Sequence, residues 1–118
     1  MSKHKTEKAV VYRIYTKDKD NIKVIEEIIY RQFPDGGFTV IYTAGGWKSK
    51  IENSQVIEII GKIGDKYKVL TIAGDIKNKN NQESVLVTTA TVSINEINWK
   101  EKQNGKNIYK KKTSWFCT

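Results

Sequence analysis

The fold of this chain is decided first by residues 9–16, which read Ala-Val-Val-Tyr-Arg-Ile-Tyr-Thr. β-Branched and aromatic residues dominate this stretch, as is typical of a β-strand. Apolar residues at helical spacing follow, and they predict a helix over residues 21–33 that Asp18 or Asp20 can cap. Residues 34–37, Pro-Asp-Gly-Gly, end this helix in a turn. The apolar stripe of the helix consists of Ile22, Ile25, Ile29 and Phe33.

Two further strands are predicted at residues 38–42 and 56–60, where β-branched side chains again predominate. Between them lie Gly45-Gly46-Trp47-Lys48 and a polar turn through residues 52–54. The polar residues 52–54 favour a turn there. We therefore expect two short strands with these two stretches between them.

A second helix and a fourth strand complete the pattern. Gly64 and Asp65 cap the helix, and the Asn-rich residues 78–81 end it. Residues 84–92 read Ser-Val-Leu-Val-Thr-Thr-Ala-Thr-Val and give the strongest strand signal in the chain. The order β-α-β-β-α-β predicts an α+β, ferredoxin-like fold with an antiparallel sheet and two helices. The apolar stripe of the second helix consists of Val69, Ile72, Ala73 and Ile76.

The two ends of the chain lie outside this pattern. Residues 1–8 are expected to be a basic tail, residues 9–92 the core, and residues 93–118 an extension. Asn104-Gly105 separates two strand-like runs, residues 94–102 and 107–116, which predicts a C-terminal β-hairpin. Lysines alternate there with aromatic residues, so the hairpin suits either a nucleic-acid backbone or docking on a neighbouring subunit.

Composition narrows the partners. The chain has 118 residues and a formal net charge of +8, and Arg13 and Arg31 are its only arginines. This charge favours polyanions, anionic surfaces or phosphorylated small molecules, although lysine can also be abundant because of genome composition. Residues 1–8 lack the apolar segment of a signal peptide, no apolar run reaches the roughly 18 residues of a membrane span, and Cys117 is the single cysteine. We expect a cytoplasmic protein without a membrane partner.

Few side chains could carry out catalysis. His4 is the only histidine and lies in the expected tail, and Cys117 has no histidine near enough to activate it. The His, Cys, Asp and Glu residues do not show metal-ligand spacing, and neither a P-loop nor a dinucleotide-binding glycine motif occurs. The sequence therefore predicts a binding protein without catalytic residues, metal or cofactor.

Several residues could bind an anionic ligand. The two glycines before Trp47 allow close backbone approach, the indole offers a stacking surface, and Lys48 can pair with a phosphate. An alternative interpretation is a strand-end turn whose tryptophan covers the core. Asn and Gln side chains can bind the edge of a base, although asparagines also commonly end helices. The full set of predicted ligand-binding residues is Arg13, Trp47, Lys48, Asn81, Gln82, Ser84, Lys100 and Lys102.

Residues 33–92 resemble a group of small phage and bacterial ferredoxin-like domains, and within it most closely the first family of Thoeris anti-defence proteins. The resemblance rests on Phe-Pro-Asp-Gly-Gly-Phe-Thr-Val, Gly-Gly-Trp-Lys, Val-Ile-Glu-Ile-Ile and Asn-Gln-Glu-Ser-Val-Leu-Val-Thr. It implies a phage-encoded sponge that sequesters a cyclic ADP-ribose isomer or a cyclic oligonucleotide, and that assembles as a homo-dimer or larger homo-oligomer. It also implies that Asn81 contacts the ligand. That family carries arginines after the last core strand, where this chain has lysines.

The leading hypothesis is therefore a non-enzymatic protein that encloses a small cyclic nucleotide signal. Trp47 and tyrosines would stack the base, Arg13 and the lysines would neutralise phosphates, and Asn81 and Gln82 would bind polar edges. Two other hypotheses remain open. One is a basic nucleic-acid-binding protein, such as an inhibitor of an RNA-guided nuclease, and the other is a structural interaction module.

Overall fold

The computed structural model covers residues 1–118 and describes residues 2–103 and 106–109, with side chains described for residues 6–97. Strands and helices account for most of the described chain. In chain order, the elements are β1 (Ser2–Lys17), α1 (Ile22–Gln32), β2 (Thr39–Trp47), β3 (Lys50–Gly61), the 3-10 turn η1 (Ile63–Asp65), α2 (Lys66–Lys79), β4 (Leu86–Gln103) and β5 (Lys106–Tyr109).

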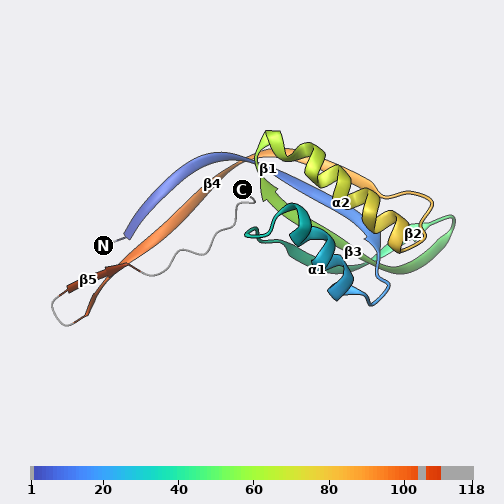
Figure 1. The fold of residues 1–118 in the computed structure, drawn as a ribbon, viewed down its shortest axis with the longest axis horizontal. Coiled ribbons are helices and arrows are strands. Elements are labelled where there is room, and N and C mark those ends of the chain that lie inside the picture. The colour runs from blue at the N-terminus through green and yellow to red at the C-terminus, as the bar shows by residue number, and fades with distance from the viewer. Residues whose placement is uncertain (1, 104–105, 110–118) are drawn as a thin grey trace.

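The strands form an antiparallel sheet in the order β2-β3-β1-β4, and β5 extends it beyond β4. Each helix connects two strands that lie on either side of a third, which is the ferredoxin-like arrangement. Both helices cover the same face of the sheet (Figure 1). The predicted α+β fold is confirmed, and a layer of two helices on one sheet encloses the core.

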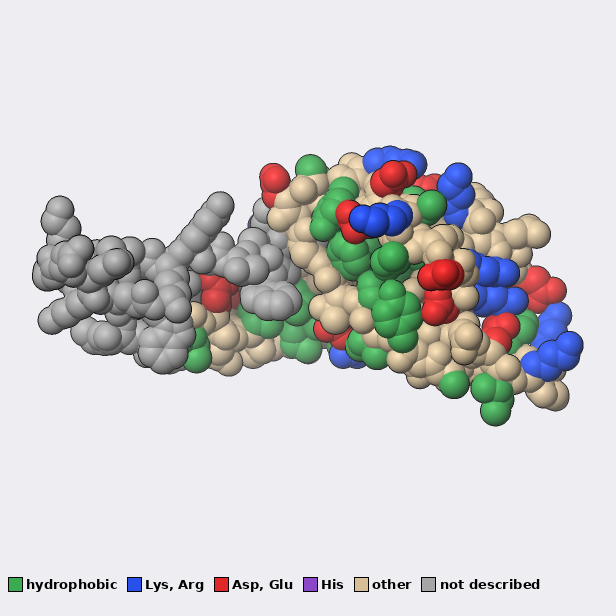
Figure 2. All heavy atoms as spheres, turned by 90° about the horizontal axis from the view of Figure 1, so that it is seen from below, with side chains coloured by type: hydrophobic (Ala, Val, Ile, Leu, Met, Phe, Trp, Pro, Cys, Tyr) green, Lys and Arg blue, Asp and Glu red, His purple; other side chains and the backbone are tan. Residues whose placement is uncertain are grey.

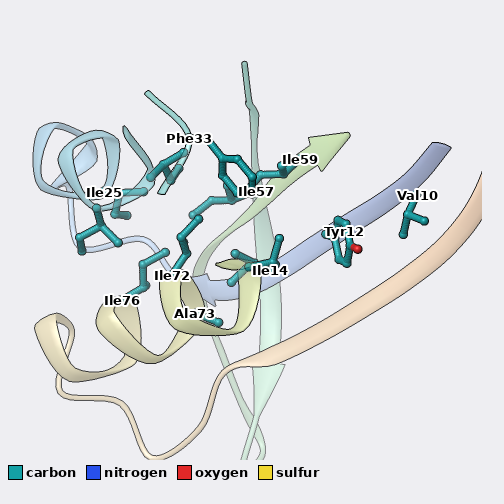
Figure 3. Packing of buried hydrophobic residues seen from close by; sticks show 13 residues of the cluster. Val10, Tyr12, Ile14, Ile25, Phe33, Ile57, Ile59, Ile72, Ala73 and Ile76 are labelled. Atoms are coloured by element: carbon teal, nitrogen blue, oxygen red, sulfur yellow. The ribbon is translucent and has the colours of Figure 1, made fainter. Parts of the chain in front are cut away.

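The core fills the space between the helices and the inward-facing positions of β1 and β3 (Figure 3). Tyr12, Ile14 and Ile57 from the sheet are almost fully buried against the helices. The stripe predicted for α2 is buried at all four positions. In α1, Ile28 joins the buried stripe, whereas Ile22 is only partly buried. Full burial of each such aliphatic side chain contributes roughly 1.5–3 kcal/mol, so these contacts fix how the helices sit on the sheet.

The connection expected between β2 and β3 is instead one continuous β-hairpin. The ladder runs from the pair Thr39 and Glu58 to the pair Trp47 and Lys50. Only Lys48 and Ser49 form the turn, with φ angles of 48° and 62°. Two successive residues with positive φ match the tight turn whose twist suits a hairpin. The polar turn predicted through residues 52–54 was therefore wrong. Of the Gly-Gly-Trp-Lys stretch only Lys48 lies in the turn, because ladder hydrogen bonds hold Gly45 to Trp47 in β2 despite the weak strand propensity of glycine.

The basic tail expected for residues 1–8 is also corrected. β1 begins at Ser2, and its first residues pair with β4, from Ser2 opposite Trp99 to Lys8 opposite Ser93. β4 likewise crosses the boundary expected at residue 92 without interruption. These charged segments have little strand propensity of their own. They are strands because pairing with each other satisfies the hydrogen-bonding groups of their backbones.

The predicted C-terminal hairpin is confirmed where the structure describes it. Residues Lys100 to Gln103 of β4 pair with Lys106 to Tyr109 of β5, and Gln103 lies opposite Lys106. The remainder of its second predicted strand, residues 110–116, lies outside the described residues, as does Cys117. Among the described residues, no helix is both long and apolar enough to cross a membrane.

Candidate functional site

The end of the β2–β3 hairpin curves toward the loop between α2 and β4 (Figure 1). Residues of both segments line a cleft of about 890 Å³. The outer half of the hairpin, the end of β1 and the residues after α2 form its walls. This volume lies in the range of small-molecule sites. Five of the eight predicted ligand-binding residues line the cleft, and they come from two distant stretches of sequence. They are Trp47, Lys48, Asn81, Gln82 and Ser84.

An apolar row crosses the sheet on the face opposite the helices. Strand alternation turns Tyr15 away from its buried neighbour Ile14, and the register places Val56 of β3 and Leu86 of β4 on either side of Tyr15. Ile41 of β2 extends the row beyond Val56. Tyr15, Val56 and Leu86 all line the cleft, and Tyr15 and Leu86 are 39% and 62% exposed. Together with the half-exposed Trp47, which also lines the cleft, they offer surface for a planar ring.

The charges in the cleft are nearly balanced. Lys48 Nζ lies 3.0 Å from Glu83 Oε2, and Lys17 Nζ lies 3.4 Å from Glu52 Oε2. Lys50 also lines the cleft and forms no ion pair with another described residue. Figure 2 shows blue and red side chains interspersed over this end of the molecule. The cleft can therefore bind negative groups with lysines and positive groups with carboxylates, and its own net charge is small.

The loop that carries Asn81 is shaped by the end of α2. The backbone N–H of Asn81 donates to Asn78 O at 3.2 Å, and that of Gln82 donates to Lys77 O at 3.0 Å. Asn81 has a φ of 51°. These features define a Schellman-type helix end, in which the residue after the cap adopts the left-handed conformation. Asparagine tolerates this conformation better than most residues, so Asn81 has a structural role whether or not it contacts a ligand.

A polar network behind the cleft holds this loop against β1. Asn80 Nδ2 donates to Thr16 Oγ1 at 3.2 Å and to Gln82 Oε1 at 3.1 Å, and the Thr16 hydroxyl donates to the same Oε1. Asn21 Nδ2 donates to Asn80 Oδ1 at 2.8 Å. Thr16 and Asn80 are buried. The side-chain amide oxygen of Gln82 therefore already accepts hydrogen bonds from within the protein, and Gln82 contributes to the cleft mainly by fixing the loop.

The two glycines of β2 differ in their surroundings. A Cβ atom at position 45 would overlap the Oγ atom of Ser54 on β3, whereas a Cβ at position 46 would meet no atom within 4 Å. Both positions line the cleft. Gly45 thus serves close packing within the hairpin, and Gly46 leaves open space in the cleft.

The other predicted residues lie elsewhere. Arg13 is two positions before Tyr15 on β1, outside the lining of the cleft, and its Nε donates to Glu58 Oε2 at 2.9 Å. Lys100 and Lys102 belong to the part of β4 that pairs with β5, at the opposite end of a molecule 61 Å long (Figure 1). The structure therefore does not unite these three residues with the cleft.

Sequence reasoning missed the acidic residues of the cleft. Glu52 and Glu83 are paired with lysines from other elements, and Lys48 and Glu83 are 35 residues apart. Such long-range pairs leave no periodic signal in one sequence. Tyr15 could have been found from the sequence, because successive side chains of a strand point to opposite faces. With Ile14 facing the core, Tyr15 must face away from it. Among the described residues, no group of three His, Cys, Asp or Glu side chains could hold a metal ion.

Comparisons with known proteins identify the fold. No protein-family model matches the chain, and no curated protein matches its sequence. The apo form of CPII, a nitrogen regulatory PII-like protein from Thiomonas intermedia K12, is similar with a TM-score of 0.58 and 10% identity over 80% of this chain and 99% of that chain. The structure of CPII bound to ADP, AMP and bicarbonate has a TM-score of 0.56 and 11% identity, over 76% of this chain and 96% of that chain. A phage SAM lyase in its apo state has a TM-score of 0.53 and 24% identity, over 72% of this chain and 87% of that chain. At these identities the likeness concerns the fold.

Proposed function

We propose that this protein binds a small adenosine-containing molecule in the cleft and sequesters it without changing it. The observation that carries this proposal is the convergence of Trp47 and Lys48 with the loop around Asn81 on one cleft of ligand size. Tyr15 and Trp47 provide aromatic surface for adenine, and the lysines provide charge for phosphates. CPII, whose fold is similar, has been solved with ADP and AMP, and adenosine is also part of S-adenosylmethionine, the substrate named for the phage lyase.

The finer proposal is a phage-encoded sponge, in the host cytoplasm, for a cyclic ADP-ribose isomer or a cyclic oligonucleotide. Its support is the resemblance of residues 33–92 to the Thoeris anti-defence family, together with the similarity of fold to a phage protein. Sequestration needs no catalytic group, and both carboxylates of the cleft are paired with lysines.

The proposed sponge acts as a homo-oligomer. The apolar row that includes Ile41, Tyr15 and Leu86 lies on the sheet face away from the helices, and these three side chains are 46%, 39% and 62% exposed. A second copy on this face would bury the row and cover the cleft beside it. Covering the cleft lowers the local dielectric and strengthens each charged contact with the ligand.

A second candidate function is an enzyme acting on a sulfonium compound such as S-adenosylmethionine. Glu52 and Glu83 favour it, because a cleft with two carboxylates suits a ligand that carries positive charge. The phage SAM lyase with a similar fold is the reason to test this compound.

Mass spectrometry of the small molecules released when the purified protein is heated tests the proposal. An intact adenosine-containing molecule in stoichiometric amount is expected. Incubation with S-adenosylmethionine, followed by chromatography, separates the two candidates. Recovery of the compound unchanged supports sequestration, whereas conversion to products on repeated turnover assigns the protein to the second candidate. Release of no nucleotide, with no binding of ADP, cyclic ADP-ribose or S-adenosylmethionine in titrations, contradicts both.

A further inference from the structure

The positive charge of this protein is concentrated away from the cleft. Residues 9–92 carry 12 Lys and Arg against 10 Asp and Glu, a net charge of +2. The segments 1–8 and 93–118 together carry 9 lysines and 3 glutamates, a net charge of +6. Three of those lysines, Lys110 to Lys112, lie outside the described residues. The basic character of the chain therefore belongs mainly to its two terminal segments.

The structure places the described parts of these segments side by side in one projecting arm, where six lysines and three acidic residues give a net charge of +3. We define the arm as residues 2–8 of β1, residues 93–103 of β4, and β5. β3 ends at Gly61, opposite Val10, so the first part of the arm is a ribbon of β1 and β4 alone. Figure 1 shows the arm extending beyond the helices, and the molecule measures 61 × 27 × 26 Å. The seven residues of β1 in the arm span roughly 20 Å at about 3.3 Å per residue.

Strand register groups several lysines of the arm. Lys3 lies opposite Asn98, and positions 98, 100 and 102 of β4 alternate onto one face. Lys3, Lys100 and Lys102 therefore occupy positions on the same face of the ribbon. Lys5, on the same face, lies opposite Glu96, whereas Lys3, Lys100 and Lys102 lie opposite Asn98, Tyr109 and Asn107, none of which is acidic.

A polyanion suits the arm better than a second arm does. A two-stranded ribbon is marginal by itself in water, so a binding partner would stabilise it. Two copies of the arm would bring like charges together, which disfavours self-association. The major groove of B-form DNA admits a two-stranded β-ribbon, and phosphates line both sides of that groove. We propose that the arm binds the phosphate backbone of duplex nucleic acid, independently of the cleft and of its ligand.

Fluorescence anisotropy with a labelled 20-base-pair DNA duplex tests this proposal. We expect binding that weakens by at least tenfold between 50 and 200 mM NaCl, since each neutralised phosphate releases counterions. Lys100→Glu/Lys102→Glu should weaken binding by at least tenfold. Lys100→Gln/Lys102→Gln removes the charges without adding acids, and it should lower the slope of log K against log salt by about 1–2.

The matched control is Lys23→Glu/Lys66→Glu, which makes the same change in net charge at exposed positions of α1 and α2. This control should lose less than threefold in affinity, and Lys100→Arg/Lys102→Arg should bind as the wild type does. An equal loss in the helix control would assign binding to net charge alone and overturn the proposal. Absence of duplex binding at 50 mM NaCl, or an unchanged salt slope in the Gln variant, would overturn it as well.

Discussion

Lys48 in the turn of the β2–β3 hairpin lies 3.0 Å from Glu83 in the loop after α2, so this ion pair spans the cleft. Both side chains are about two-thirds exposed, and such pairs contribute no more than about 1 kcal/mol to stability. The pair therefore matters for what the cleft binds more than for how firmly the chain folds.

The first prediction follows from this pair. If the ligand carries phosphates, Lys48→Ala should weaken binding of cyclic ADP-ribose by about tenfold or more, the cost of a lost charged hydrogen bond. Glu83→Gln should leave binding unchanged or strengthen it, because Lys48 loses its competing partner. Isothermal titration calorimetry measures both. The reverse order, with Glu83→Gln the more damaging variant, would favour a cationic ligand.

Asn81 allows its two roles to be separated. Asn81→Gly keeps the left-handed conformation at no steric cost, so the thermal midpoint should stay within a few degrees of the wild type. Asn81→Val should destabilise the protein by about 1–2 kcal/mol, because a β-branched residue disfavours positive φ. If the amide contacts the ligand, Asn81→Gly should also weaken binding. Unchanged affinity in a stable Asn81→Gly variant would limit Asn81 to ending the helix.

Tyr12 predicts how stability depends on pH. Its hydroxyl donates to Lys62 O at 2.6 Å, and burial, with a smaller effect of the nearby Asp65 carboxylate, raises the pKa of Tyr12 above its ordinary value of 10.0. The unfolded chain therefore releases this proton first as pH rises. The protonated Tyr12 hydroxyl therefore contributes its full share to the free energy of unfolding below pH 10, and this share is lost as pH rises through the raised pKa of Tyr12.

Urea denaturation of the wild type and of Tyr12→Phe at pH 7, 9 and 11 measures this effect. At pH 7 the variant should be about 1 kcal/mol less stable, since it lacks the hydrogen bond to Lys62. Between pH 9 and 11 the wild type should lose stability relative to Tyr12→Phe. Parallel curves for the two proteins would show that this hydroxyl does not titrate differently on unfolding.

The apolar row predicts the effect of Ile41 on assembly. Ile41→Lys puts a charge into the face proposed to contact a second copy and should lower the mass measured by light scattering to that of a monomer. Ile63→Lys is the matched control, because Ile63 is 83% exposed in η1, before α2. A wild-type protein that is monomeric at 100 μM, or an Ile41→Lys protein of unchanged mass, would contradict the proposed interface.

The helices and the core were predictable because burial leaves a periodic signal. The stripe Val69, Ile72, Ala73 and Ile76 has helical spacing, and its burial in α2 follows directly. The same applies to Ile25, Ile29 and Phe33 at α1. Segments whose structure depends on pairing with a distant strand gave no such signal. Residues 2–8 are polar and charged, and only their pairing with residues 93–99 makes them part of β1.

The candidate site was partly predictable for a similar reason. The side-chain types of Trp47, Lys48 and Asn81 were enough to predict ligand binding, and the fold brings these residues to one cleft. Their acidic neighbour Glu83 and the apolar Leu86 belong to the cleft only because β1, β3 and β4 lie side by side. Lys100 and Lys102 were assigned to the site on charge alone, and the long β4 carries them to the far end of the molecule.

Gly46 gives the most direct test of the central claim. Position 46 lines the cleft and has open space around it, so Gly46→Val should place its side chain in the cleft without disturbing the hairpin. Gly74→Ala, in α2 and also in open space, is the matched control and should stabilise the helix by roughly 0.5–1 kcal/mol. Both variants should be titrated by calorimetry with ADP, cyclic ADP-ribose and S-adenosylmethionine. We predict that the wild type and Gly74→Ala bind at least one of these compounds equally, and that Gly46→Val binds it at least tenfold more weakly. Equal affinity in all three proteins would contradict binding in the cleft.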